Sequence, residues 1–227
     1  MSKVPVITID GPSGSGKGTV SRAVAKSLGW ALLDSGALYR LVALAARRSS
    51  ISLEDAAALG QLAGRFNIRF GSHETGEEAV WLDDQDVTRA IRTEAAGNDA
   101  SKVAGLPPVR AALLERQRGF AVPPGLVADG RDMGTVVFPH ATLKIFLTAS
   151  AAQRAQRRYN QLKEKDSGVS LAALSLEIAE RDRRDSTRSV APLLPAADAI
   201  VLDSTHMSAV EVADEIFAHG RGRALWP

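Results

Sequence analysis

The chain has 227 residues, of which 45% are hydrophobic and 24% charged, and its formal net charge is +2. This length and balance predict one α/β domain with a buried core rather than two independent domains. The lack of cysteine excludes a disulfide framework and a thiolate metal site, and the small net charge gives no reason to expect general affinity for nucleic acid. No apolar stretch approaches the roughly 20 residues that cross a bilayer, so we expect a soluble cytoplasmic protein with no membrane contact.

Five short apolar runs predict buried strands, and most of them are followed by helical periodicity. The runs are residues 4–9, 30–33, 126–128, 143–147 and 199–202. Strands that alternate with helices favour a parallel sheet covered on both faces. Four of the runs end on an aspartate: Asp10, Asp34, Asp129 and Asp203. These carboxylates should lie at the sheet edge where ligands bind, except that Asp203 is expected to cap a turn, with Ser204 and Thr205 beginning a helix.

A glycine-rich segment directly follows the first predicted strand and precedes an amphipathic helix. It consists of Gly11, Pro12, Ser13, Gly14, Ser15, Gly16, Lys17, Gly18 and Thr19. In this context successive backbone N–H groups cradle a phosphate, the helix dipole adds positive charge, and the lysine reaches the terminal phosphates. We therefore predict a P-loop in which these nine residues bind ATP, because an ordinary glycine-rich turn does not combine the lysine, the spacing and the strand–helix context.

Gly18 occupies the position at which a P-loop usually carries the serine or threonine that binds Mg²⁺. We therefore expect Mg²⁺ to be held by phosphates and water without a direct protein ligand. Asp129 is the candidate for contacting the water shell of the ion.

The alternation of strands and helices stops between about Phe66 and Asp99. Residues 67–70, 79–82 and 85–87 predict short strands, joined by a loop over residues 71–76 and a turn at Asp83 and Asp84. This segment is predicted to be a small antiparallel insert in the α/β chain.

A P-loop alone does not distinguish a kinase from a GTPase switch or a motor. The chain lacks the Asn-Lys-x-Asp element of guanine-specific GTPases, and it supplies many arginines instead. Transfer between phosphates needs positive charge around a loose transition state, and an acceptor phosphate is already anionic, so no general base is required.

Two predicted helices carry these arginines. In the first, Ser150 is the expected N-cap, and Arg154, Arg157 and Arg158 face one way, where they can close over ATP and exclude water. In the second, an apolar stripe of Leu171, Leu174 and Ile178 continues as Arg181, Asp185 and Arg188, which is typical of a helix that leaves the core and enters a polar site. Solvated surface arginines, with an Arg181–Asp185 pair, are the open alternative for both helices.

RNA binding by residues 151–190 is a weaker alternative. Nine basic residues in this stretch are interspersed with six acidic ones, which an RNA-binding face does not need. Tyr159 is the only aromatic residue nearby that could stack on a base.

Five motifs together resemble bacterial cytidylate kinases over essentially the whole chain. They are residues 9–19, 34–40, 128–139, 180–185 and 191–198. The resemblance implies a single P-loop kinase domain with a three-layer α/β/α core and a five-stranded parallel sheet of order 2-3-1-4-5. It also implies a core of residues 1–62, 100–153 and 169–227, a nucleoside-monophosphate-binding insert at about 63–99, a helical lid at about 154–168, and a monomer.

The same resemblance implies transfer of the γ-phosphoryl group of ATP to CMP or dCMP, with Mg²⁺. The implied catalytic residues are Lys17, Arg131, Arg154, Arg157, Arg158 and Arg188. The implied CMP-binding residues are Ser35, Tyr39, Arg40, Ser101, Arg110, Arg131, Asp132, Arg181, Asp185 and Arg188. An aspartate such as Asp132 can accept from the cytosine amino group, whereas uracil would leave it poorly paired. A kinase for adenylate or shikimate, and a binding protein that uses ATP as a switch, remain the alternatives.

Overall fold

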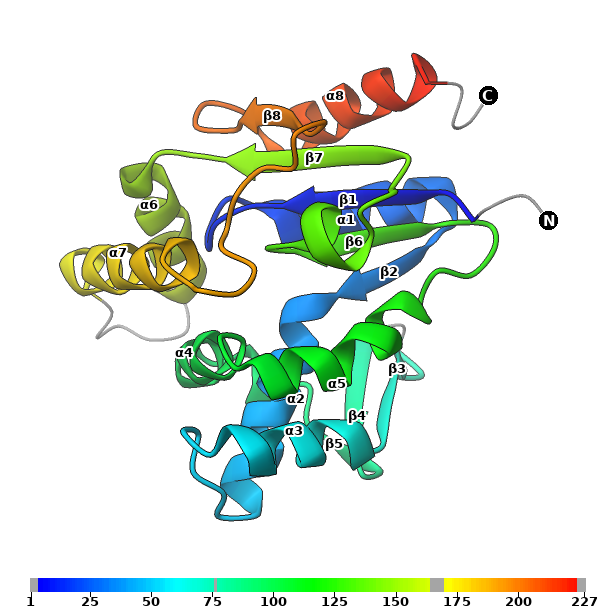
Figure 1. Cartoon of the computed structure of the whole chain (residues 1–227). Coiled ribbons are helices and arrows are strands. Elements are labelled where there is room, and N and C mark those ends of the chain that lie inside the picture. Colours follow the sequence, from blue (N-terminus) through cyan, green and yellow to red (C-terminus); the bar gives the residue numbers. More distant parts are fainter. Residues whose placement is uncertain (1–3, 76, 164–169, 224–227) are drawn as a thin grey trace. The chain divides into compact units, whose positions relative to one another are not determined.

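The computed structural model describes residues 4–75, 77–163 and 170–223 (Figure 1). The chain divides into two compact units, one made of Met1–Asp34 with Arg118–Pro227 and the other of Ser35–Gln117. Residues 164–168 of the expected lid lie outside the described residues. Within the described ranges, no helix is both long enough and apolar enough to cross a membrane.

The larger unit is built on a five-stranded parallel sheet. Its strands, in sheet order, are β2 (Ala31–Asp34), β6 (Leu126–Gly130), β1 (Val6–Asp10), β7 (Leu143–Thr148) and β8 (Ile200–Asp203). All five predicted runs form strands, and their order is the expected 2-3-1-4-5. The register places Asp10 opposite Gly130 and Asp34 opposite Asp129, so the strand-terminal carboxylates gather at one edge.

Helices α1 (Lys17–Leu28) and α8 (Ala209–Arg221) share one hydrophobic core with the sheet (Figure 1). Ile7 and Ile145 of the sheet pack in the same cluster as Val24 of α1, and all three are at most 1% exposed. Each fully buried aliphatic side chain of this kind stabilises the fold by roughly 1.5–3 kcal/mol. This packing fixes both ends of the loop between β1 and α1.

The start of α8 differs from the prediction. Ser208 is its N-cap and forms a capping box with Glu211, with the Ser208 N–H donating to Oε2 at 2.7 Å. Ser204 and Thr205 therefore do not begin the helix. The carboxylate of Asp203 accepts from the backbone N–H of Thr205 at 2.9 Å, which confirms its expected turn-capping role.

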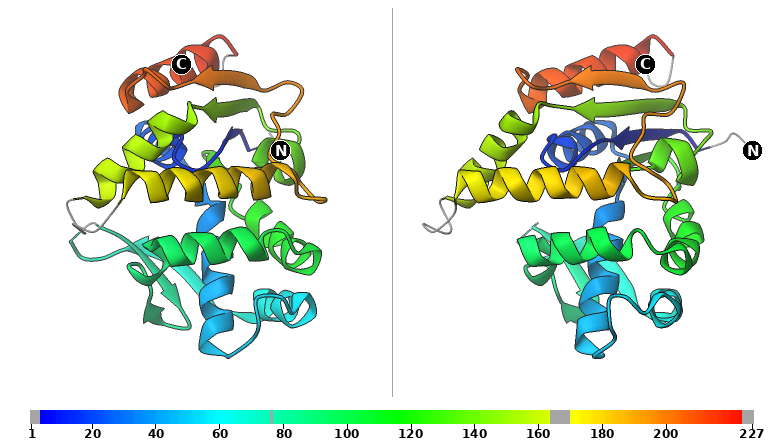
Figure 2. Two further views of the ribbon diagram at one scale, coloured as in Figure 1. Left: turned by 90° about the vertical axis from the view of Figure 1, so that its left-hand side faces the viewer. Right: turned by 60° about the vertical axis from the view of Figure 1, so that its left-hand side comes forward.

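Helices α6 (Ala151–Leu162) and α7 (Leu171–Ser186) pack against each other beyond the carboxyl ends of β1 and β7 (Figures 1 and 2). Ser150 caps α6 as predicted and accepts from the N–H of Gln153 at 3.2 Å.

The predicted inward stripe of α7 is confirmed for Leu174, Ile178 and Asp185, which are all buried. It is wrong at Leu171, the first residue of the helix, which is 39% exposed.

The smaller unit combines four α-helices and one 3₁₀ turn with a three-stranded antiparallel sheet. The helical segments are α2 (Ser35–Arg48), α3 (Ala56–Arg65), η1 (Ala90–Arg92), α4 (Glu94–Val103) and α5 (Pro107–Arg118). The strands, in order across the sheet, are β3 (Ile68–Ser72), β4 (Glu78–Leu82) and β5 (Gln85–Asp86). This confirms the antiparallel insert and the turn at Asp83 and Asp84, both of which have positive φ. The predicted loop begins too early, because Gly71 pairs with Ala79 and so belongs to β3.

Candidate active site

The glycine-rich loop lies between β1 and α1 in the larger unit, as predicted. Gly16 is the N-cap of α1 with φ +93° and no side-chain cap, so the first helical N–H groups face outward without an intrahelical partner. A Cβ on Gly11, where φ is +157°, would lie 2.0 Å from the carbonyl oxygen of Leu147, and only glycine fits this approach. The loop is therefore a cradle of backbone donors at a helix N-terminus, a geometry that suits a phosphate group.

Lys17 is the first residue of α1, and its ammonium group donates to the carbonyl oxygen of Pro12 at 3.1 Å. Burial, together with the positive charge of Arg131, lowers the pKa of Lys17 from 10.5 to about 7. Asp129 acts in the opposite direction but does not compensate. A buried lysine in this state gains strongly from a nearby anion, as a phosphate-binding lysine should.

Asp129 lies beside this lysine and beside the second residue of α1. Burial raises its pKa to about 6, partly opposed by the charge of Lys17. A Cβ on Gly18 would lie 3.2 Å from Oδ2 of Asp129, so the carboxylate stands next to the position that usually carries a hydroxyl. One carboxylate facing a phosphate cradle fits Mg²⁺ that keeps most of its ligands as phosphate oxygens and water. Over the described ranges, no group of three or more His, Asp or Glu side chains is arranged to hold a metal ion by itself.

Two arginines of α6 donate hydrogen bonds to backbone carbonyl groups of the loop. Arg154 is 5% exposed, donates to the carbonyl oxygen of Ser13 at 3.0 Å, and pairs with both carboxylate oxygens of Asp182 at 2.9 and 2.5 Å. Arg157 donates to the carbonyl oxygen of Ser15 at 3.2 Å. The structure thus brings both predicted arginines to the loop, where they contact its carbonyl groups. Their expected contact with donor phosphates stays a prediction.

Ser204 is a further support of the loop. Its hydroxyl oxygen lies 3.1 Å from the carbonyl oxygen of Ser15 and 3.0 Å from that of Thr148, so its proton can be donated to either. The same oxygen accepts from Nη1 of Arg157 at 3.1 Å. The sequence predicts a helix start at Ser204 and does not reveal this supporting role. The sequence shows only a serine after a strand-terminal aspartate, whereas in the structure Ser204 is buried directly after β8.

Arg158, the third predicted arginine of α6, donates from Nη1 to Oε1 of Gln161 at 3.0 Å in an exposed position. This hydrogen bond is made within α6 and does not involve the glycine-rich loop. A role for Arg158 at the donor phosphates also stays a prediction.

A second cluster joins β6 to α7. Arg131 donates from Nε to Oδ2 of Asp185 at 2.8 Å, and Arg188 bonds to the other oxygen of the same carboxylate. Burial alone would raise the pKa of Asp185, but the charges of Arg131 and Arg188 outweigh it and hold the pKa below its usual value. The positive charge of Arg181 lowers the pKa of both Asp185 and Lys17. Four of the predicted residues are thus brought together at this edge of the sheet.

Asp132 directly follows Arg131 and is the N-cap of a π-helical turn, η2 (Met133–Val137). The residue is 3% exposed, so this carboxylate is shielded from bulk water. π-helical turns are frequent at functional sites.

The smaller unit holds the remaining predicted residues. Arg110 donates to the hydroxyl of Tyr39 at 3.3 Å, so these two are brought together. Arg40 donates to the carbonyl oxygen of Ile91 at 2.9 Å. Ser35 and Ser101 are buried, at the start of α2 and near the end of α4.

A family model and individual proteins of known name that are similar to this chain all point to the same family. The family model described as cytidylate kinase matches residues 7–221. Three similar proteins are cytidylate kinases of Pseudomonas fluorescens strain SBW25, Methylococcus capsulatus and a Marinomonas strain. They are 59, 60 and 57% identical over 95, 92 and 94% of this chain and 95, 93 and 94% of their own length.

Proposed function

Because the chain belongs to the cytidylate kinase family, we propose that it transfers the γ-phosphoryl group of ATP to CMP or dCMP, giving ADP and CDP or dCDP. One observation carries this proposal beyond the family relationship. The phosphate cradle with Lys17 and the cluster of Arg131, Asp185 and Arg188 are built at the same edge of one sheet. A switch needs only the first of these; a transfer reaction between two anions needs both.

On the donor side, the proposal assigns the β- and γ-phosphates of ATP to residues 11–19, with Lys17 on the terminal phosphates. Mg²⁺ would neutralise charge that develops on the phosphate oxygens, and Asp129 would orient its water shell. Arg154, Arg157 and Arg158 would complete this side, the first two chiefly by holding the loop.

On the acceptor side, the proposal assigns the CMP phosphate to Arg40, Arg131 and Arg188. The sugar would be held by Ser101, Arg181 and Asp185. The cytosine would be held by Ser35, Arg110, Asp132 and Arg188, with Tyr39 supporting Arg110. The proposal keeps residues of about 63–99 as the insert that binds the nucleoside monophosphate and residues of about 154–168 as the lid.

The chemistry asks little of proton transfer. An oxygen of the CMP phosphate attacks the γ-phosphorus of ATP, the bond from that phosphorus to the β–γ bridging oxygen breaks, and ADP leaves with the electron pair. The attacking phosphate is already ionised near neutral pH, so the chain needs no general base. Its contribution is to hold the two anions in line with positive charge around them.

We also propose that the protein acts as a monomer in the cytoplasm, where its nucleotide substrates are found. The proposal includes no nucleic-acid or membrane partner.

The test is ADP release with Mg²⁺ and ATP against CMP, dCMP, UMP, AMP and GMP. Turnover confined largely to CMP and dCMP is the expected result. Equal turnover with AMP would mean that the site reads only the phosphate. Silence with every acceptor, while ATP still binds, would favour the switch and overturn the proposal.

A further inference from the structure

The carboxylate of Asp10 has no part in the roles described so far, yet it is buried and both of its oxygens accept hydrogen bonds. Asp10 ends β1 and is 5% exposed. Its Oδ1 accepts from the backbone N–H of Met133, and its Oδ2 accepts from that of Gly134, both at 2.8 Å. Both oxygens are therefore used to hold the first two residues of η2.

The path of the chain explains what this contact fixes. Asp10 lies opposite Gly130 in the register of β1 and β6. The chain leaves β6 at that point, passes through Arg131 and Asp132, and returns to the carboxylate of Asp10 at Met133. On its other side Asp132 is held by its own carbonyl oxygen, which accepts from the N–H groups of residues 136 and 137 at 2.9 and 3.2 Å.

We propose that Asp10 is a positioning residue of the acceptor site, which sets the place of the Asp132 carboxylate and so the discrimination between cytosine and uracil. The inference rests on the proposed function, in which Asp132 reads the amino group of cytosine. Asp10 itself does not touch the substrate. It acts through the backbone that carries Asp132. Because Gly11 follows Asp10 directly, the donor loop begins next to the residue that holds the base-reading turn.

A carboxylate is the group that suits this position. Each of its oxygens faces one N–H donor, whereas an asparagine would turn its NH₂ group toward one of them. Burial raises the pKa of Asp10 to about 7, the neighbouring carboxylates of Asp132 and Asp129 add to this, and the N–H groups of Met133 and Gly134 oppose it. The ionised form, which accepts with both oxygens, therefore dominates at pH 8, where the test is best made.

The test compares Asp10→Asn with the wild type in steady-state kinetics at pH 8, with saturating Mg²⁺ and ATP and with CMP or UMP as acceptor. The KM for CMP should rise about tenfold and the ratio of kcat/KM for CMP over UMP should fall about tenfold, since a displaced Asp132 loses a pairing that UMP does not make. The Kd for ATP should change by less than about twofold. An unchanged ratio of kcat/KM for CMP over UMP, whether or not both values fall, would show that Asp10 only supports the fold and would overturn the proposal.

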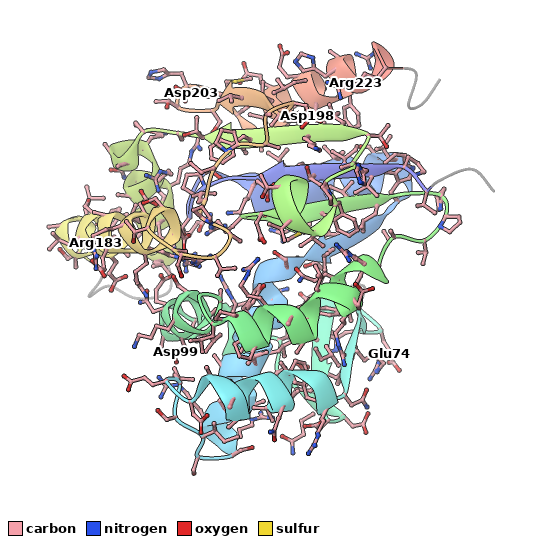
Figure 3. The ribbon with its side chains drawn as sticks, viewed as in Figure 1. Glu74, Asp99, Arg183, Asp198, Asp203 and Arg223 are labelled. Atoms are coloured by element: carbon pink, nitrogen blue, oxygen red, sulfur yellow. The ribbon has the colours of Figure 1, made fainter. Side chains whose placement is uncertain are left out.

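Asp203→Asn is the matched control. Asp203 also ends a strand and also accepts from a backbone N–H, that of Thr205, but it is exposed on β8 (Figure 3). This variant should match the wild type in every constant.

If Asp10→Asn does not fold, Gly134→Ala probes the same contact from the other side. A Cβ at Gly134 would lie 2.9 Å from Oγ1 of Thr8 and 3.2 Å from Cδ of Lys144, so the turn must shift. The same fall in the CMP-to-UMP ratio is expected. An unchanged ratio, or failure of both variants to fold, would overturn the proposal. A wild type that does not prefer CMP to UMP would instead fail the proposed function, before either variant is made.

Discussion

Nucleotide binding to the glycine-rich loop should be accompanied by proton uptake at Lys17. Burial and the charge of Arg131 lower the pKa of this lysine to about 7 in the free protein. At pH 8 a base with that pKa carries its proton in only about one molecule in ten. A triphosphate at Nζ favours the charged ammonium and should return the pKa toward its ordinary value, so each binding event should take up about 0.9 proton.

Isothermal titration calorimetry measures this uptake. ATP is titrated into the protein at pH 8 in buffers of different ionisation enthalpy, and the dependence of the observed enthalpy on the buffer gives the number of protons bound. Asp129, whose pKa is about 6, is ionised at this pH and contributes little. At pH 6 Lys17 already carries its proton, so its share of the uptake should fall to about 0.1.

Lys17→Arg is the control for this assignment. Its guanidinium stays charged at every pH used, so ATP should still bind but the uptake at pH 8 should disappear. Lys17→Ala should keep the fold and abolish phosphoryl transfer. A wild type that binds ATP at pH 8 without proton uptake, or a Lys17→Arg variant with undiminished uptake, would refute the reasoning.

Three further variants test the assignments separately. Asp132→Ala should raise the KM for CMP more than for UMP, and equal losses in steady-state kinetics would remove its base-reading role. Gly11→Ala should abolish ATP binding in calorimetry, because its Cβ would lie 2.0 Å from the carbonyl oxygen of Leu147; near-normal affinity would contradict this. Asp185→Asn should lower the free energy of unfolding by about 3 kcal/mol in urea titrations, because Arg131 loses its buried partner, and a change below about 0.5 kcal/mol would show that water replaces the carboxylate.

The sheet and the loop could be predicted because their signals are local. An apolar run such as that before Asp10 identifies a strand, and the glycine and lysine spacing that follows it identifies the loop whatever the rest of the chain does. The boundaries of elements depend on partners that a local pattern does not show. β3 extends through Gly71 because a partner strand supplies its hydrogen bonds, and α8 begins at Ser208 rather than at Ser204 because only Ser208 completes a capping box.

Periodicity predicted the acceptor cluster only as a face of α7, and it was the family resemblance that added Arg131 to the same site. The steps from Ile178 to Asp185 show that the charged residues continue the buried stripe. They do not show that Arg131, 54 positions away, completes the pairing, because that depends on how β6 and α7 are brought together.

The partners of the arginines of α6 could not be predicted from sequence either, and the structure shows what these arginines do. Spacing places Arg154 and Arg157 on one face, but their partners, the carbonyl groups of Ser13 and Ser15, are 141 and 142 residues away in the chain. In a trans peptide unit the C=O and the following N–H point in opposite directions. A guanidinium that holds the Ser13 carbonyl therefore turns the N–H of Gly14 toward the other side of the loop, and Arg157 does the same for the next residue but one. The guanidinium groups that bind the carbonyl groups of the loop can thus orient the amide N–H groups that receive the phosphates, without contacting a phosphate themselves.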